Sequence, residues 1–235
     1  MNILAIGCHP DDLEIGCGGT LAKYAELGHQ VVMCHVANGN MGHAVILPDE
    51  LREIRAKEAE NAGKVLGAAE VISLDVPDLK VDSKEEETVH KVIDVIRYVK
   101  PDLIITHSPD DYMRDHLEVG RLVFDAGFSS SVPQLHTNRP AFPGIVPIYY
   151  MDTLAGVNFL PADYVDISET IRRKLLAVEC HQSQVGWMKD HDDIDFPDFV
   201  RTVSKFRGLQ CGAAYAEGFK VCAVWPRLGT KRLLP

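Results

Sequence analysis

The sequence lacks several features that mark particular classes of protein. Its six cysteines form no CxxC pair and no evenly spaced framework, which excludes a disulfide scaffold and a cysteine-rich zinc module. Positive charge is scarce as well, because 24 lysines and arginines face 34 aspartates and glutamates, for a formal net charge of -10. This balance disfavours nucleic acid and anionic membranes, whose binding relies on basic side chains that neutralise phosphates. A neutral or cationic small-molecule substrate is favoured instead.

Long hydrophobic runs are also absent. No stretch of about 18 apolar residues occurs, and the chain runs from Met1 directly into a strand-like segment without a basic region or hydrophobic leader. We therefore expect a cytoplasmic protein with reduced cysteines that neither spans nor binds a membrane. With 235 residues, of which 46% are hydrophobic, the chain can build a sizeable core, and a single domain over residues 1–235 is predicted.

Short apolar segments alternate with amphipathic ones through the first half of the chain. The apolar segments are typical of buried parallel strands, and the amphipathic ones have the periodicity of helices. The predicted strands are residues 2–7, 30–36, 71–76 and 102–107, and the predicted helices are residues 19–27, 47–66 and 85–99. This alternation predicts right-handed βαβ units in an α/β fold, with a Rossmann-like, mostly parallel sheet flanked by helices.

The regular pattern fades after Pro133. Residues 133–147 contain four prolines and are expected to form a surface loop. Regular structure is predicted again at residues 148–151 and 164–167 as strands and at residues 168–180 and 197–210 as helices. Because no linker separates this half from the first, we interpret it as a C-terminal cap or extension of the same domain.

Polar side chains follow two of the predicted strands. His9, Asp11 and Asp12 come directly after the first strand, and the segment from His107 to His116 follows the strand at residues 102–107. In open α/β sheets, ligands bind beyond the carboxyl ends of the strands, at a point where the strand order reverses. If the order reverses beside the first strand, these two strands become neighbours and the two polar clusters converge.

Convergence of histidine and aspartate is what a catalytic zinc site requires. Such a site has three protein ligands and one open position, and His9, Asp12 and His116 satisfy that count. Asp11 is then left beside the metal, where its carboxylate can take a proton from the water that attacks a carbonyl carbon. In an alternative interpretation, residues 9–12 form only a turn that caps the following helix. The second cluster, after another strand, favours the metal site.

The segment GCHPDDLEIGCGGTLAKYAELGHQV, at residues 7–31, closely resembles the N-terminal signature of the LmbE-like or PIG-L deacetylases. IRAKEAENAGKVLG at residues 54–67, YVDISETIRRKLLAVECHQSQ at residues 164–184 and AYAEGF at residues 214–219 look like the bacillithiol-biosynthesis branch of that family. The resemblance covers nearly the whole chain. It implies a zinc-dependent hydrolase that removes an N-acetyl group from a glucosamine-type sugar conjugate, and a homo-oligomer, either a trimer or a hexamer.

The resemblance also implies roles for individual residues. His9, Asp12 and His116 would bind zinc, Asp11 would be the general base, and Arg55 matches a family position near the substrate. Tyr112 and Met113 are expected in contact with the substrate as well. Asp115 is expected either to hold His116 by a hydrogen bond or simply to favour the N-terminus of a helix.

This chain departs from the family pattern at Met113, where the family usually has a histidine that stabilises the oxyanion. A thioether donates neither a proton nor a strong hydrogen bond. Three interpretations remain open. In the first, zinc and Asp11 are enough for catalysis without a further oxyanion donor, and in the second, Tyr112, Arg114 or His191 supplies that donor. In the third, the chain is a zinc-retaining, sugar-binding relic with little turnover. An amidase acting on thiol conjugates is a further alternative. Substrate selection is expected to lie in the proline-rich loop and in residues 182–197.

Overall fold

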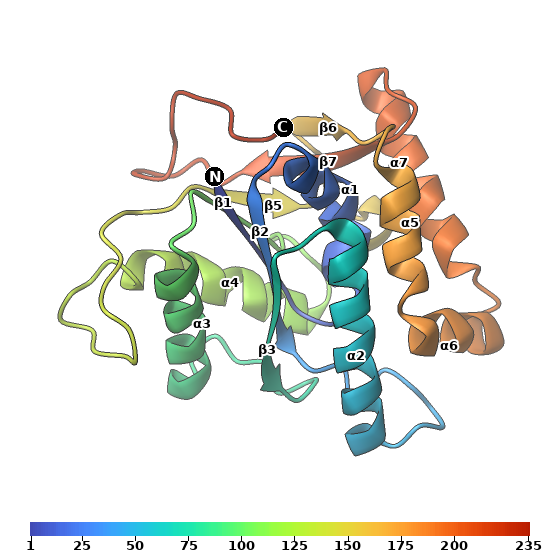
Figure 1. Ribbon diagram of the computed structural model, residues 1–235, viewed down its shortest axis with the longest axis horizontal. Helices are drawn as coiled ribbons and strands as arrows, with labels where there is room; N and C mark the ends of the chain where they lie inside the picture. Colours follow the sequence, from blue (N-terminus) through green and yellow to red (C-terminus); the bar gives the residue numbers. More distant parts are fainter.

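The computed structural model describes all residues, Met1–Pro235, and its centre is one sheet of seven strands (Figure 1). The strand order across the sheet is β3-β2-β1-β4-β5-β7-β6. The strands are β1 (Asn2–Gly7), β2 (Gln30–Ala37), β3 (Glu70–Val76), β4 (Leu103–Thr106), β5 (Ile148–Met151), β6 (Asp163–Asp166) and β7 (Ala216–Val221). The first five strands pair in parallel, and β7 pairs antiparallel with both β5 and β6. The predicted α/β fold with a mostly parallel sheet is confirmed.

Helices cover both faces of this sheet. They are α1 (Asp12–Glu26), α2 (Pro48–Leu66), α3 (Glu86–Val99), α4 (Arg114–Ser129), α5 (Ile171–Glu179), α6 (Gln182–Asp192) and α7 (Phe196–Cys211), with a short 3₁₀ helix at Leu154–Gly156. Alternate residues of β1 point to opposite faces: Leu4 and Ile6 pack in the core beneath α3 and α4, and Ile3 and Ala5 pack in the core beneath α1 and α2 (Figure 1). None of the helices is both long enough and apolar enough to cross a membrane.

The order of the strands reverses beside β1, as the position of the polar clusters predicts. Strand β1 pairs with β2 on one side and with β4 on the other, and Ile6 lies opposite Thr106. The segments that leave β1 and β4 therefore start side by side at the carboxyl edge of the sheet. This is the crevice in which open α/β sheets bind their ligands.

Helix α1 begins at Asp12, not at residue 19, so the predicted start of this helix is wrong. Gly16, Gly18 and Gly19 delayed the predicted start because glycine disfavours helices. In the structure they lie inside α1 and let it pack closely. A Cβ atom at Gly16 would lie 2.6 Å from the sulfur of Met151, and one at Gly19 would lie 2.8 Å from the side chain of Ile167. Asp12 is consequently held on a rigid helical turn.

Helices α4 and α6 and strand β7 were not predicted from the sequence. Helix α4 follows the second polar cluster directly, so His116 lies in its first turn. Strand β7 inserts between β5 and β6, which makes the C-terminal half an extension of the same sheet. The proline-rich loop lies between α4 and β5 as expected, and the buried guanidinium of Arg97 donates to the backbone oxygens of Ser130, Val132, Leu135 and Arg139. A single buried cation thus anchors that loop.

Candidate active site

The polar segment after β1 turns sharply before α1 begins. Asp11 precedes the helix with φ 122° and ψ -28°, a conformation that residues with a Cβ rarely adopt. The backbone N–H of His9 donates to Oδ2 of Asp12 at 2.6 Å, which closes the turn. Strained backbone of this kind costs about 1–3 kcal/mol and is concentrated at functional sites. The turn brings the side chains of His9, Asp11 and Asp12 to the end of β1.

Asp12 lies between two histidines from separate parts of the chain. Its Oδ2 is 3.4 Å from Nδ1 of His9, and its Oδ1 is 3.3 Å from Nε2 of His116. Two ligand atoms of a tetrahedral zinc, each bonded at about 2.1 Å, are about 3.4 Å apart. Both pairs therefore have the spacing of ligands that share one cation. The predicted convergence of the two polar clusters is observed.

Other metal-binding side chains lie close by. Donor atoms of Cys8, His9 and Asp12 lie within 4.8 Å of one another, as do those of Asp12, His107 and His116. Of the three predicted ligands, His9 belongs to the first group, His116 to the second and Asp12 to both. Nε2 of His107 accepts the N–H of Cys8 at 2.9 Å, whereas Nε2 of His116 is buried without a hydrogen-bond partner. Burial also raises the pKa of the Cys8 thiol to about 12. The free lone pair therefore favours His116 over His107, and the raised pKa disfavours Cys8.

The charges at this point of the fold favour a bound cation. Burial opposes ionisation of Asp12, but the charge of His116 and close contacts with His9 and His107 hold its pKa well below its usual range. Burial likewise opposes protonation of His116, but Asp12 and Asp111 raise its pKa to about 9. These carboxylates attract positive charge to the site. Because metal ligands must be deprotonated, a divalent cation would take the place of the protons on the imidazoles.

The histidines are oriented by different aspartates than we expected. Asp111 lies 3.1 Å from Nδ1 of His116 and leaves Nε2 facing Asp12, which is the arrangement that fixes a metal-binding imidazole. Asp115, predicted to hold His116, instead lies 3.6 Å from Nε2 of His9 and accepts the N–H of Leu79 at 2.7 Å. The prediction missed Asp111 because its role depends on the turn before α4. Its only sequence signal is its place in the same polar cluster.

Asp11 points away from these donors toward Arg55, with Oδ2 3.0 Å from Nη2 of the guanidinium. Arg55 is only 3% exposed and also donates to the backbone oxygens of Pro10 and Gly39. Burial raises the pKa of Asp11 to about 6, and the charge of Arg55 limits that rise. A carboxyl with this pKa is ionised at neutral pH and is still basic enough to take up a proton.

A cavity of about 620 Å³ opens beside this site, and His9, Asp11, Asp12 and Arg55 lie in its wall. The three residues that follow Asp111, Tyr112 to Arg114, also line it. His116 lines a separate void of about 10 Å³ that shares Asp12 with the cavity. Asp12 therefore lies at the boundary between the two spaces, with His9 on one side and His116 on the other.

The remaining predictions for this cavity hold in part. Residues 182–197 contribute Gln184, Met188, Ile194 and Phe196 to its wall, but the proline-rich loop contributes nothing. His191, one of three possible oxyanion donors, lies outside the wall and packs against Trp187 with tilted rings, 4.2 Å between ring centroids. The acidic segment around it is the exposed end of α6, and the inner side of α6 borders the cavity.

A second buried pair of ionisable side chains beside the site was not predicted from the sequence. Glu14 of α1 and His181, just before α6, are both fully buried, with Nε2 of His181 3.3 Å from Oε1 of Glu14. Both belong to segments that resemble the deacetylases, but neither has a recognisable metal-ligand spacing. The pair ties the first turns of α1 to the start of α6, which borders the cavity.

Comparisons with known proteins agree with this geometry. The diacetylchitobiose deacetylase of Thermococcus kodakarensis is 29% identical over 93% of this chain and 82% of its own length. The structure of N,N'-diacetylchitobiose deacetylase from Pyrococcus horikoshii matches with a TM-score of 0.81 and 26% identity, over 93% of this chain and 82% of that one. A 4-carboxy-2-hydroxymuconate hydratase from Pseudomonas putida shares the fold, with a TM-score of 0.83 and 22% identity over 99% of this chain and 100% of that one. Residues 4–127, which carry the whole predicted site, match the family described as PIG-L: GlcNAc-PI de-N-acetylase. The chain belongs to the PIG-L family.

Proposed function

We propose that this protein is a cytoplasmic, zinc-dependent deacetylase that hydrolyses the N-acetyl group of a glucosamine-type sugar conjugate. The observation that carries the proposal is the buried Nε2 of His116, which has no hydrogen-bond partner and faces Asp12 at 3.3 Å. Burying such an atom unpaired is costly, and a cation would satisfy it. The two deacetylases to which the chain is similar over 93% of its length support the same chemistry.

His9, Asp12 and His116 are the ligands we propose for zinc. Each histidine lies at the spacing of zinc ligands from one oxygen of Asp12, and both imidazoles lie beside this ionised carboxylate. Bound there, zinc supplies Lewis-acid chemistry that polarises the amide carbonyl and activates water. Asp111 keeps Nε2 of His116 directed at the site, and Asp115 supports His9 from the opposite side.

Asp11 is the general base in this proposal. Its carboxylate takes the proton of the attacking water and passes it to the leaving amine as the C–N bond breaks. Arg55 holds Asp11 ionised and in place through their 3.0 Å ion pair. Arg55 was expected to contact substrate. Its Nη1 and Nη2 donate to backbone oxygens and Nη2 also contacts Asp11, so we propose that it acts by positioning Asp11.

The oxyanion needs a donor that Met113 does not supply. Of the three residues predicted for this role, Tyr112 and Arg114 line the cavity and His191 does not. The hydroxyl of Tyr112 is held only by a long 3.4 Å contact to the oxygen of Leu154. We therefore propose Tyr112 as the donor. In a Tyr112→Phe variant, kcat should fall by about 10²-fold at nearly unchanged KM. Unchanged turnover would exclude this residue.

Acetate release from N-acetylglucosamine, N,N'-diacetylchitobiose and N-acetylglucosaminyl thiol conjugates tests the activity itself. Zinc-loaded protein should release one acetate per amine formed from at least one of these substrates. Cleavage confined to a different amide of the thiol conjugates would establish the amidase alternative. Zinc binding without acetate release from any of these substrates would favour the alternative of a sugar-binding relic with little turnover. Light scattering on the same sample measures whether the chain assembles as the predicted trimer or hexamer.

A further inference from the structure

The cavity beside the proposed metal site is apolar over most of its wall. Eleven of its 20 lining residues are hydrophobic. The side chains that make up this apolar wall are Met41, Leu79, Met113, Met188, Ile194 and Phe199. Met41 and Leu79 are 55% and 64% exposed to solvent, respectively, so large apolar groups stand uncovered at a site that binds a ligand. An exposed apolar surface in a cavity marks a binding site for an apolar group.

Two polar side chains of the same cavity, Asp78 and Gln184, are already paired within the protein. Both carboxylate oxygens of Asp78 accept backbone N–H groups, those of Gly39 and Met41. The amide nitrogen of Gln184 donates to the oxygen of Gly42 at 3.1 Å. A second sugar ring would bury several hydroxyls here without partners, and each unpaired hydroxyl costs free energy. The part of the wall around Asp78 and Gln184 is therefore poorly suited to a second sugar ring.

Backbone strain is concentrated around this cavity. Seven residues other than glycine have positive φ, and Asp11, Leu79 and Ala155 are three that line the cavity. Leu79 has φ 64°, and its N–H is held by Asp115, the same carboxylate that supports His9. Positive φ costs free energy at a leucine, and an exposed leucine side chain regains little of that cost by burial. The aspartate beside the metal site thus also fixes the apolar wall.

We propose that the preferred substrate is an amphipathic N-acetylated glucosamine derivative whose alkyl or aryl group lies against this apolar wall. The inference rests on the proposed deacetylase function and names its substrate class. The cavity volume of about 620 Å³ leaves room for such a group beside one sugar ring, and falls within the range of about 300–1,000 Å³ that buries a drug-sized ligand. Met113 belongs to this wall, which accounts for an apolar residue where the family usually has histidine.

Two homologous series of substrates test the proposal. The first series carries methyl, butyl, octyl and phenyl aglycones on N-acetylglucosamine, and the second carries N-acetyl, N-butyryl and N-octanoyl groups on methyl glucosaminide. Each methylene that becomes fully buried should raise kcat/KM by about fourfold. We expect at least a tenfold gain from methyl to octyl in the aglycone series, whereas a gain confined to the N-acyl series would contradict an N-acetylated substrate. Equal kcat/KM along both series overturns the inference and leaves the deacetylase function intact.

A binding measurement separates failure of the inference from failure of the function. Calorimetry on the Asp11→Asn variant, with octyl and methyl N-acetylglucosaminide below their micelle concentrations, needs no turnover. Octyl N-acetylglucosaminide should bind at least tenfold more tightly than methyl N-acetylglucosaminide. Equal affinity overturns the inference even if the wild type is an active deacetylase. Tighter binding of the octyl compound supports the apolar wall even if no acetate is released.

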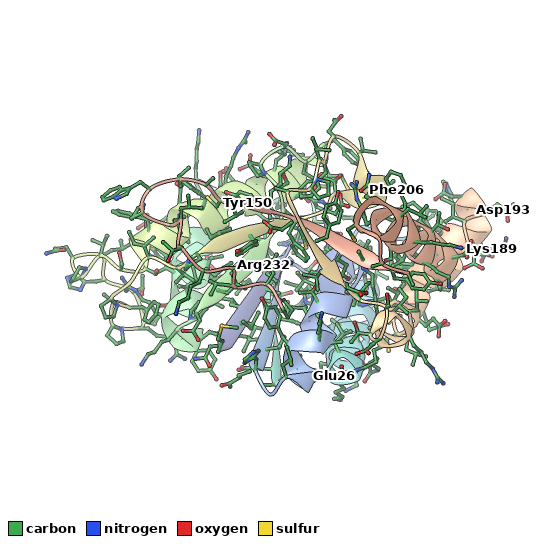
Figure 2. The ribbon with its side chains drawn as sticks, turned by 90° about the horizontal axis from the view of Figure 1, so that it is seen from above. Glu26, Tyr150, Lys189, Asp193, Phe206 and Arg232 are labelled. Carbon is green, nitrogen blue, oxygen red and sulfur yellow. The ribbon has the colours of Figure 1, made fainter.

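Helix α7 offers a matched pair of variants. Phe199 lines the cavity, whereas Phe206 is 50% exposed elsewhere on the same helix (Figure 2). Phe199→Ser should remove most of the octyl preference, and Phe206→Ser should keep it. Loss of the preference in both variants, or in neither, contradicts the assignment of the wall. Thermal unfolding of both variants shows whether the fold is retained.

Discussion

The ion pair between Arg55 and Asp11 gives a prediction that can be worked through in numbers. Arg55→Met removes a charge 3.0 Å from the carboxylate while keeping a long apolar side chain in its place. The charge of Arg55 lowers the pKa of Asp11, which burial otherwise raises, to about 6. An opposite charge this close shifts a carboxyl pKa by about 1–3 units. The pKa of Asp11 should therefore rise by about that amount in the variant.

The pH profile of kcat/KM measures this shift. A general base must be ionised, so activity falls as the pH drops through its pKa. The acid limb should lie at higher pH in Arg55→Met than in the wild type, and the activity lost at pH 6 should largely return at pH 9. Arg52→Met is the control, because Arg52 lies on the same helix and pairs with the exposed Asp75. An acid limb that stays in place, or moves to lower pH, refutes the role of Arg55.

Three further variants address the fold and the site. Glu217→Ala leaves the buried ammonium of Lys174 unpaired and should lower the free energy of unfolding, measured in urea, by about 3–5 kcal/mol; a loss below about 1 kcal/mol would contradict a structural role for the pair. Asp111→Asn loses the charge that orients His116 and should weaken zinc binding by about 10–100-fold in a chelator competition, and unchanged affinity would count against that contact. Met113→His adds a second donor beside Tyr112 and should change the rate of acetate release on N-acetylglucosamine by less than about tenfold, whereas a rise of about 10²–10³-fold would mean that Tyr112 does not serve as the donor.

The positions of the first four strands were accessible from the sequence because buried parallel strands read as apolar runs. Strands β1 and β4 are both of this kind, and the polar residues after each one gave the place of the site. Strand β7 was not predicted because its sequence, AEGFKV, contains a buried glutamate and a glycine. That glutamate, Glu217, binds the N–H groups of Gly19 and Thr20 and the ammonium of Lys174, a tertiary arrangement that no local pattern reveals.

The candidate ligands were predictable from residue type and position, but the contacts around them were not. His9, Asp12 and His116 follow from the two polar clusters. Which aspartate supports which histidine depends on the turn that joins β4 to α4, so the prediction assigned Asp115 to His116 and missed Asp111. The apolar wall of the cavity is likewise tertiary, because it joins side chains from segments far apart in the chain.

The central claim is that one zinc ion, held at His9, Asp12 and His116, lies beside a separate general base, Asp11. The most direct test is the metal content of purified Asp11→Asn and Asp12→Asn proteins, measured together with acetate release. The account predicts about one zinc per chain in Asp11→Asn with turnover lost, and loss of zinc in Asp12→Asn. Loss of zinc in Asp11→Asn with retention in Asp12→Asn would contradict it, because the two aspartates would then have exchanged roles.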